Sequence, residues 1–375
     1  MKKIIHISTG LENGGAEGVL YRLCKGDKHN THIVVSLIGR GKYADLLEAE
    51  GIRVYCLNMP SGRVSINGLL TLYRLIKQQN ADVIQTWMYH ADLIGGVVAK
   101  LARAKSIYWN VRHSTIEIEH SKKSLVLVAK ACSILSKWIP KKIIYCAEQA
   151  KVTHEQLGYD SSKSIVIGNG YDLELFTVDN AGAHTFRSSI GLEQSELLIG
   201  MIGRYNPQKD HHNLLQSLYL VKQAGYSFKC VLIGREIERN NQVLFEQVDN
   251  LNLTEEIILL GQRTDIPHIM NALDINILSS SFGEGFPNVL AEAMACGTPC
   301  VTTNVGDAGL IVKSTGWVVS PKNHNELADA IIGAIKEKEL QEENWLNRSK
   351  ACRKRVEDNF SINSMINNYH AAWSI

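Results

Sequence analysis

Residues 281–297, SFGEGFPNVLAEAMACG, carry the most specific pattern in this chain of 375 residues. Pro287 suits the first turn of a helix and Gly297 suits its C-terminal cap, so the pattern predicts a helix over residues 287–296. The glycines ahead of this helix permit close approach of the backbone, and the helix N-terminus offers amide groups to an anion. The segment therefore predicts an anion-binding turn.

Two carboxylates flank this turn. Glu284 lies in the loop ahead of the helix and Glu292 lies in its second turn, so the two could reach opposite ends of one extended ligand. The alternative is that Glu292 faces solvent and Glu284 is only a turn residue, which is the commoner situation for two isolated glutamates.

Two cations follow a second buried strand. Residues 200–210 read GMIGRYNPQKD. Arg204 and Lys209 lie in the loop that joins the strand to the next helix, where they are well placed to neutralise a diphosphate. Taken alone, Arg and Lys residues in loops are commonly just solvated.

A glycine-rich turn joins the first strand to the first helix. Residues 9–17, TGLENGGAE, include Gly15 and Glu17. The turn lacks both the Gly-x-Gly-x-x-Gly spacing and the Walker lysine, so it is weak evidence for a phosphate loop. Glu17 can also be explained as an acidic residue that favours the first turn of a helix.

Short Val/Ile-rich runs alternate with longer helical patterns along the whole chain. This alternation predicts an α/β protein with parallel sheets that are covered by helices on both faces. The strands that we expect are residues 3–8, 32–37, 54–57, 83–86, 106–110, 142–146, 164–167, 197–202, 228–233, 257–260, 275–278, 299–302 and 317–319. A polar stretch at 179–191 places the predicted domains at 1–180 and 181–358, with a final helix in 359–375.

Together these segments resemble the retaining, sugar-nucleotide-dependent glycosyltransferases of family 4. The match also includes residues 167–176, IGNGYDLELF, and it spans nearly the whole chain. The resemblance implies the GT-B fold, with two Rossmann-like domains whose parallel sheets face a central cleft. It also implies that the last helix crosses back to pack on the first domain.

The resemblance assigns most of the donor site to the second domain. Arg204 and Lys209 would bind the diphosphate, and Glu292 would accept hydrogen bonds from the ribose. Glu284 would lie near the donor sugar as a catalytic residue. The residues implied as donor-binding are Gly15, Arg204, Lys209, Arg263, Glu284, Gly285, Phe286, Pro287, Asn288 and Glu292. No Asp-x-Asp triplet occurs, so we expect neither a bound metal nor another cofactor.

The acceptor is expected on the first domain. His90 and the pair Arg112-His113 each follow a predicted strand, which places them at carboxyl ends. His113 matches the active-site histidine of the family and is the second catalytic candidate, while His90 and Arg112 are acceptor-side candidates. The alternative for each histidine is a structural role with its hydrogen bonds satisfied.

The implied activity is transfer of a hexose or N-acetylhexosamine from a sugar nucleotide, with uridine preferred, to a glycan or lipid-linked acceptor. Such reactions build bacterial surface polysaccharides, including capsule, O-antigen and lipopolysaccharide. Two alternatives remain open: an inactive sugar-nucleotide-binding partner in an assembly complex, and a sugar-nucleotide epimerase on the same fold.

Charge and composition limit the partners and the compartment. Hydrophobic residues make up 45% of the chain, enough for a large core, and this excludes a disordered or fibrous protein. Residues 1–180 carry 23 Lys+Arg against 16 Asp+Glu, which falls short of a dedicated nucleic-acid binder. No run of ~20 apolar residues occurs, and the eight scattered cysteines favour a reducing compartment. We therefore expect a cytoplasmic protein.

Residues 122–138 predict a helix that contacts the inner face of the membrane. Lys123, Lys130 and Lys137 are spaced seven apart, with Leu127 and Ile134 between them. Cations attract anionic headgroups and apolar side chains insert shallowly. The alternative is a charged helix whose Leu127 and Ile134 pack under a neighbouring loop.

Overall fold

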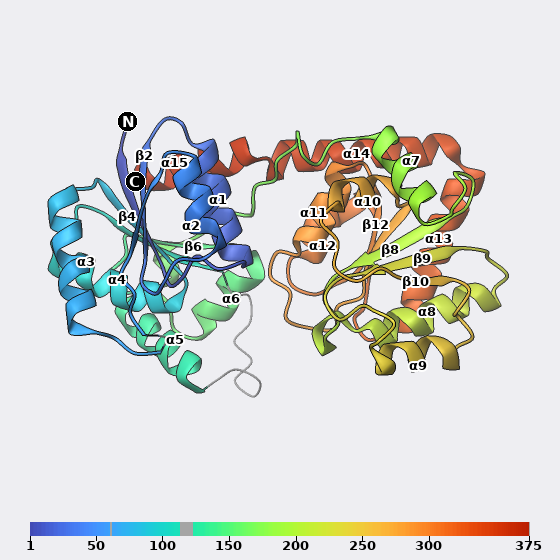
Figure 1. Cartoon of the computed structure of the whole chain (residues 1–375), viewed down its shortest axis with the longest axis horizontal. Coiled ribbons are helices and arrows are strands. Elements are labelled where there is room, and N and C mark those ends of the chain that lie inside the picture. Colours follow the sequence, from blue (N-terminus) through green and yellow to red (C-terminus); the bar gives the residue numbers. More distant parts are fainter. Residues whose placement is uncertain (61, 113–122, 375) are drawn as a thin grey trace. The chain divides into compact units, whose positions relative to one another are not determined.

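The computed structural model describes residues 1–60, 62–112 and 123–374, except for the side chain of Lys123 (Figure 1). The chain forms two compact units, residues 1–170 together with the C-terminal segment from Ile362, and Tyr171–Ser361. This division precedes the predicted boundary at residue 180. The reason is that Tyr171 donates its backbone N–H to the carbonyl of Phe360 and packs in the core of the second unit.

The first unit is built on a parallel sheet of seven strands in the order β3-β2-β1-β4-β5-β6-β7. The chain reverses direction across the sheet after β3, so β1 and β4 are neighbours. The strands are β1 (Lys3–Ser8), β2 (Thr31–Ser36), β3 (Arg53–Cys56), β4 (Val83–Trp87), β5 (Ile107–Val111), β6 (Lys142–Tyr145) and β7 (Ser164–Val166).

Helices cover both faces of this sheet. One face packs against α1, α2 and α15, and the other packs against the remaining four helices, as the two core clusters of the unit show. The helices are α1 (Gly15–Gly26), α2 (Lys42–Ala49), α3 (Ile66–Gln79), α4 (Tyr89–Leu101), α5 (Lys123–Leu135), α6 (Glu148–Gln156) and α15 (Ile362–Ser374).

The C-terminal helix α15 is anchored on the first unit by buried polar contacts. Asn110 Nδ2 donates to Tyr369 Oη over 2.7 Å, and Trp373 Nε1 donates to Gln85 Oε1 over 3.0 Å. Because these groups are buried, each would cost free energy without its partner. The last helix is therefore an integral part of the first unit.

A chain of buried polar groups runs beneath α15. Trp87 Nε1 donates to His6 Nδ1 over 3.1 Å, and His6 Nε2 lies 2.9 Å from His32 Nδ1. Asp27 Oδ2 contacts His32 Nε2 at 3.2 Å and His370 Nε2 at 2.8 Å. Burial lowers the pKa of His6 well below its ordinary value. Burial favours a higher pKa for Asp27, but hydrogen bonds with His32, Asn30 and His370 outweigh it and hold that pKa below its usual range.

The second unit contains a parallel sheet of six strands in the order β10-β9-β8-β11-β12-β13. Its strands are β8 (Leu198–Ile202), β9 (Lys229–Ile233), β10 (Ile257–Leu259), β11 (Ile275–Leu278), β12 (Cys300–Thr303) and β13 (Trp317–Val319). Its α-helices are α7 (Asn180–Ser189), α8 (His211–Gln223), α9 (Gln242–Asn250), α10 (Ile266–Ala272), α11 (Asn288–Ala295), α12 (Ala308–Val312), α13 (His324–Leu340) and α14 (Glu342–Phe360).

The strands of both sheets match the thirteen that the sequence predicts to within two residues at each end. Both sheets are parallel and covered by helices, so the predicted fold class of two Rossmann-like domains is confirmed. Within the described ranges, no helix combines the length and the apolar character needed to cross a bilayer.

The buried His6 predicts a loss of stability in acid. Its pKa is depressed by burial in the folded state, so its contribution is present above the unfolded pKa of about 6.5 and is lost as the pH falls. We expect the free energy of unfolding of the first unit to fall by about 1.4 kcal/mol per pH unit below this value. Urea denaturation at several pH values gives the slope of the unfolding free energy against pH. In His6→Gln this slope should be smaller by that amount. An unchanged slope would show that His6 is not the titrating group.

Candidate functional site

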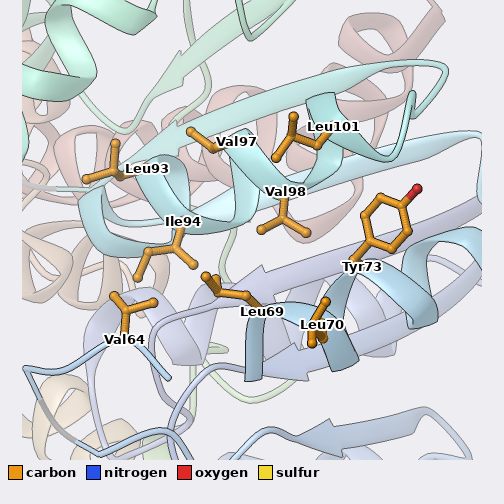
Figure 2. Close-up of a pocket in the computed structure, with 9 residues that line it drawn as sticks. All are labelled: Val64, Leu69, Leu70, Tyr73, Leu93, Ile94, Val97, Val98 and Leu101. Atoms are coloured by element: carbon orange, nitrogen blue, oxygen red, sulfur yellow. The ribbon is translucent and has the colours of Figure 1, made fainter. Parts of the chain in front are cut away.

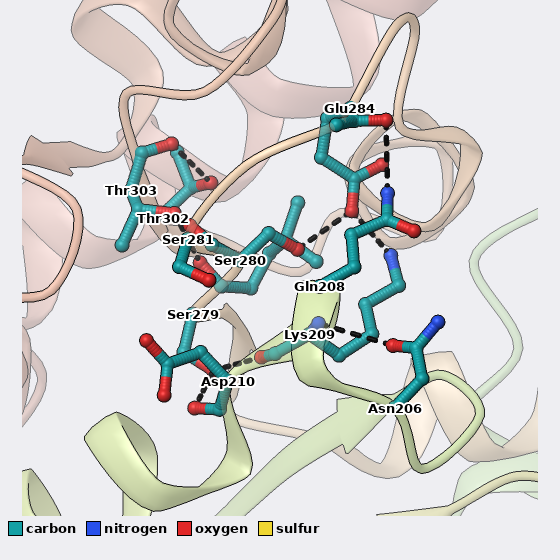
Figure 3. A network of polar contacts seen from close by, with 12 residues as sticks. Asn206, Gln208, Lys209, Asp210, Ser279, Ser280, Ser281, Glu284, Thr302 and Thr303 are labelled. Carbon is teal, nitrogen blue, oxygen red and sulfur yellow. Dashed lines mark hydrogen bonds and ion pairs between the residues drawn. The ribbon is translucent and has the colours of Figure 1, made fainter. Parts of the chain in front are cut away.

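The centre of the candidate site is an ion pair between two loops of the second unit. Lys209 Nζ lies 2.6 Å from Glu284 Oε1, and Ser280 Oγ donates to the same oxygen over 2.6 Å (Figure 3). The Lys209 and Glu284 side chains are only 14% and 8% exposed. Because β8 and β11 are neighbours in the sheet, the loops after them share one edge.

Hydrogen bonds hold the two loops in a fixed geometry. The Asn206 side chain accepts from the backbone N–H of Lys209 over 3.1 Å and caps a short 3-10 turn. Gln208 Nε2 donates to the carbonyl of Gly283 over 2.9 Å, and Ser279 Oγ donates to the carbonyl of Lys209 over 2.8 Å. The ammonium group of Lys209 is thus presented by an ordered backbone.

The loop after β12 packs closely against the backbone of Glu284. Gly306 has φ of +59°, and a Cβ atom there would lie 2.2 Å from the carbonyl oxygen of Glu284. Asp307 donates its backbone N–H to the carbonyl of Gly285 over 2.9 Å. Only glycine permits this approach, so Gly306 helps to fix the position of the carboxylate.

Arg204 is the exposed cation of the site. It follows β8 and Gly203, whose backbone N–H donates to the carbonyl of Ile233 over 2.8 Å. Within the described ranges, no hydrogen bond or ion pair engages its side chain. The guanidinium is therefore available to a ligand, whereas Lys209 already has a partner.

Helix α11 begins at Asn288, one residue after the predicted start, with Pro287 at its N-cap. Pro287, as the N-cap residue, supplies no side-chain hydrogen bond to this end of the helix. Glu292 lies half-buried in α11. Phe286 stacks on Tyr171, and the Tyr171 hydroxyl donates to Asn288 Oδ1 over 2.5 Å. These contacts give Phe286 and Asn288 structural partners as well.

Arg263 does not point freely toward a ligand. Its Nε and Nη2 groups donate to the two oxygens of Asp265 over 2.9 and 2.6 Å. The loop that contains it follows β10, and the carbonyl of Gly261 accepts from the backbone N–H of Gly234 over 2.8 Å. The predicted donor contact of Arg263 would have to share the guanidinium with Asp265.

The acceptor-side candidates lie in the first unit, at the carboxyl ends of β4 and β5. His90 is in the first turn of α4. Arg112 Nη2 donates to Asn169 Oδ1, and its guanidinium lies 5.8 Å from the ring centre of Trp87. His113 lies outside the described residues. At Gly15, where α1 begins, an added Cβ would meet no atom within 4 Å.

One group of described residues has the spacing of metal ligands. Ligand atoms of His6, Cys24 and His32 all lie within 4.8 Å of one another. Both ring nitrogens of His6 are engaged in the chain of contacts beneath α15, which explains the cluster without a metal. The cluster lies in the first unit, whereas the Lys209–Glu284 pair lies in the second.

The sequence did not reveal several members of the site. Ser280, Asn206 and Gln208 are polar residues in loops, and such residues are common throughout the chain. Their position after β8 and β11 was the available signal, because ligands of parallel sheets gather at carboxyl ends where the strand order reverses. The direct pairing of Lys209 with Glu284 follows from that same adjacency.

Sequence profiles of two families match this chain. The profile described as "Glycosyl transferases group 1" matches residues 183–350, and the one described as "Glycosyltransferase Family 4" matches residues 13–175. Together they span most of both units. The chain belongs to the group 1 glycosyltransferases of family 4, and the resemblance seen in the sequence is confirmed.

Individual relatives support the same assignment. The UDP-Gal:alpha-D-GlcNAc-diphosphoundecaprenol alpha-1,3-galactosyltransferase of Escherichia coli is 27% identical over 328 residues, covering 85% of this chain and 81% of the relative. The capsular polysaccharide biosynthesis glycosyltransferase CapM of Staphylococcus aureus is 28% identical over 311 residues, covering 79% and 77%. The crystal structure of Anabaena Alr3699/HepE in complex with UDP has a TM-score of 0.86 at 23% identity and covers 99% of each chain. This likeness confirms the GT-B fold.

The ion pair predicts a specific loss of stability. Replacing Lys209 with Met leaves a largely buried carboxylate with Ser280 as its remaining donor, so the free energy of unfolding should fall by about 1–3 kcal/mol. The matched control is Lys151→Met, which breaks a surface pair with Glu148 and should cost less than about 0.5 kcal/mol. Equal losses in urea denaturation would contradict a stabilising role for the pair.

Proposed function

We propose that this chain is a retaining glycosyltransferase. It would transfer a hexosyl or N-acetylhexosaminyl group from a UDP-sugar to a glycan or lipid-linked acceptor during synthesis of a bacterial surface polysaccharide or glycoconjugate, such as capsule, O-antigen or lipopolysaccharide. The names of the E. coli and S. aureus relatives support the acceptor class. Two structures of Anabaena Alr3699/HepE, in complex with UDP and with UDP-glucose, support the donor class.

The observation that carries this proposal is the Lys209–Glu284 pair beside the exposed Arg204. An ammonium group has three donors, so Lys209 can hold the carboxylate and also contact a diphosphate. Arg204 would supply the second cation, and the N-terminus of α11 would supply amide groups. These charges would stabilise the nucleoside diphosphate as it leaves. They would do so without a metal, in keeping with the lack of an Asp-x-Asp triplet.

Glu284 is placed to act on the sugar. Both of its contacts, with Lys209 and Ser280, are made by Oε1, and Oε2 has no hydrogen bond within the described ranges. In the proposed reaction the bond from the anomeric carbon to the phosphate oxygen breaks, and the acceptor oxygen forms a bond on the same face. The departing phosphate takes the acceptor proton. Oε2 would bind a sugar hydroxyl and stabilise the positive charge that develops on the ring.

We also propose that the protein is cytoplasmic and contacts the inner face of the membrane through α5. Leu127 and Ile134 are 70% and 60% exposed, which disfavours the alternative that they pack under a loop. Lys130 on α5 and Lys137, two residues after the helix ends, are exposed as well. The opposite side of the helix, which includes Cys132, packs on the core of the first unit.

The activity is tested with a panel of nucleoside diphosphate sugars, each incubated with and without a polyprenyl-diphosphate-linked sugar. Release of UDP that depends on the acceptor, with a product that keeps the anomeric configuration of the donor, supports the proposal. Donor binding without release would point to the inactive partner, and conversion of one sugar nucleotide to another would point to the epimerase.

Arg204→Ala should weaken UDP binding about tenfold to a hundredfold, because charge-assisted hydrogen bonds contribute roughly 1.5–3 kcal/mol. Calorimetry measures the change directly. The control is Lys336→Ala, which removes an exposed cation from α13 and should leave the affinity unchanged. Equal affinities for both variants and the wild type would remove Arg204 from the donor site.

Glu284→Gln should lower turnover by roughly a hundredfold or more while UDP affinity changes little, because its proposed interaction strengthens at the reacting sugar. Glu292→Gln is the comparison, since a contact with the ribose should instead weaken UDP binding. Turnover of Glu284→Gln within about twofold of wild type, less than ~0.5 kcal/mol of barrier, would show that Glu284 is not catalytic.

A further inference from the structure

The first unit has an apolar groove between α3 and α4. It has a volume of about 370 Å³, within the range of ~300–1,000 Å³ that is usual for ligand pockets. Figure 2 shows Ile94 and Val98 of α4 on the side of the helix that is nearer to Leu69 of α3. Every lining residue is apolar or aromatic: Val64, Leu69, Leu70, Tyr73, Leu93, Ile94, Val97, Val98 and Leu101.

Large apolar side chains around the groove face solvent. Ile66, Leu101 and Leu70 are 76%, 68% and 46% exposed. Helix α4 packs between α3 and α5 on the same face of the sheet, and α5 adds the exposed Leu127 and Ile134. Scattered exposed apolar residues are ordinary, but a set gathered around one apolar groove marks an interaction surface.

Among the described residues of α3, the loop before it and α4, the exposed charged side chains are all cations. Arg63, Arg74 and Lys77 are exposed on α3 and the loop before it, and Lys100 and Arg103 are exposed at the end of α4. Arg74 and Lys77 follow Leu70 and Tyr73 by four residues, so they lie beside the groove on the helix surface.

The acidic residues of this region do not offset these cations. Residues 60–80 contain no Asp or Glu, and residues 89–105 contain only Asp92. Asp92 is fully buried, and burial raises its pKa well above the usual value. An apolar surface flanked by cations fits anionic headgroups above hydrocarbon chains. A second copy of the same surface would set cation against cation and is disfavoured.

We propose that the outer surface of α3 and α4 docks on an anionic phospholipid bilayer, with one hydrocarbon chain entering the groove. Leu93 and Ile94 lie one helical turn after His90 on α4, so the groove starts next to an acceptor-side candidate. The inference rests on the proposed function only in its choice of a membrane as partner, and it adds a binding surface distinct from α5.

The test is co-sedimentation of the full chain with vesicles, without donor or acceptor. Wild type should bind vesicles of phosphatidylglycerol and phosphatidylcholine in equal parts, bind less at high salt, and bind phosphatidylcholine alone weakly. Arg74→Gln/Lys77→Gln should lower partitioning roughly fivefold for each cation. The control Lys336→Gln/Lys350→Gln makes the same charge change on exposed positions of the second unit and should bind as wild type does.

Two further variants separate the groove from the charges and from α5. Val97→Trp fills the groove without changing charge and should lower binding several-fold, with circular dichroism and urea denaturation confirming an intact fold. Lys130→Gln/Lys137→Gln reports the share of α5. The proposal is overturned if Arg74→Gln/Lys77→Gln and Val97→Trp both bind vesicles as the wild type does. This holds whether or not Lys130→Gln/Lys137→Gln loses binding. If the wild type binds vesicles as expected but shows no turnover on a water-soluble acceptor, the proposed function is contradicted and the membrane-docking proposal is not.

Discussion

The ion pair between Lys209 and Glu284 joins two loops that are 75 residues apart in the sequence. It forms because β8 and β11 are hydrogen-bonded neighbours in the sheet, although two strands and three α-helices separate them along the chain. A lysine and a glutamate that are largely withdrawn from water must be paired to avoid a large desolvation cost. The same pair leaves one carboxylate oxygen and part of the ammonium group for a ligand. The stability of the loops and the availability of these groups to a ligand thus depend on one contact.

The strands were predictable because parallel strands buried on both faces read as Val/Ile runs, and the site loops were predictable because they follow those strands. The direction of individual side chains was not. Arg263 pairs with Asp265, and Phe286 stacks on Tyr171, because tertiary neighbours settle such contacts. The boundary at Gly170 also depends on tertiary packing, since Tyr171 joins the second core through its ring and its backbone.

Buried polar contacts fix the position of helix α15, which is far in the sequence from the rest of the first unit. An apolar interface alone would hold the helix in several registers, whereas the hydrogen bonds from Asn110 to Tyr369 and from Trp373 to Gln85 are satisfied in one. The chain from Trp87 through His6 to Asp27 adds further donors and acceptors that need partners. Burial keeps His6 neutral, so this network gains specificity without a buried positive charge at its centre.

The positive charge of the first half is concentrated rather than spread. Residues 60–80, 89–105 and 123–142 hold eleven of the 23 Lys and Arg residues of positions 1–180 but one of the 16 Asp and Glu residues. The rest of that half carries 12 cations against 15 acids and is slightly negative. Gathering like charges on adjacent helices costs electrostatic free energy in the folded state. The exposed Leu and Ile side chains on the same helices add a second cost, because their apolar surface remains in water. Both costs are offset when the surface meets an anionic partner with an apolar interior. A bilayer meets both requirements at once, and an acceptor linked to lipid would be concentrated on that same surface.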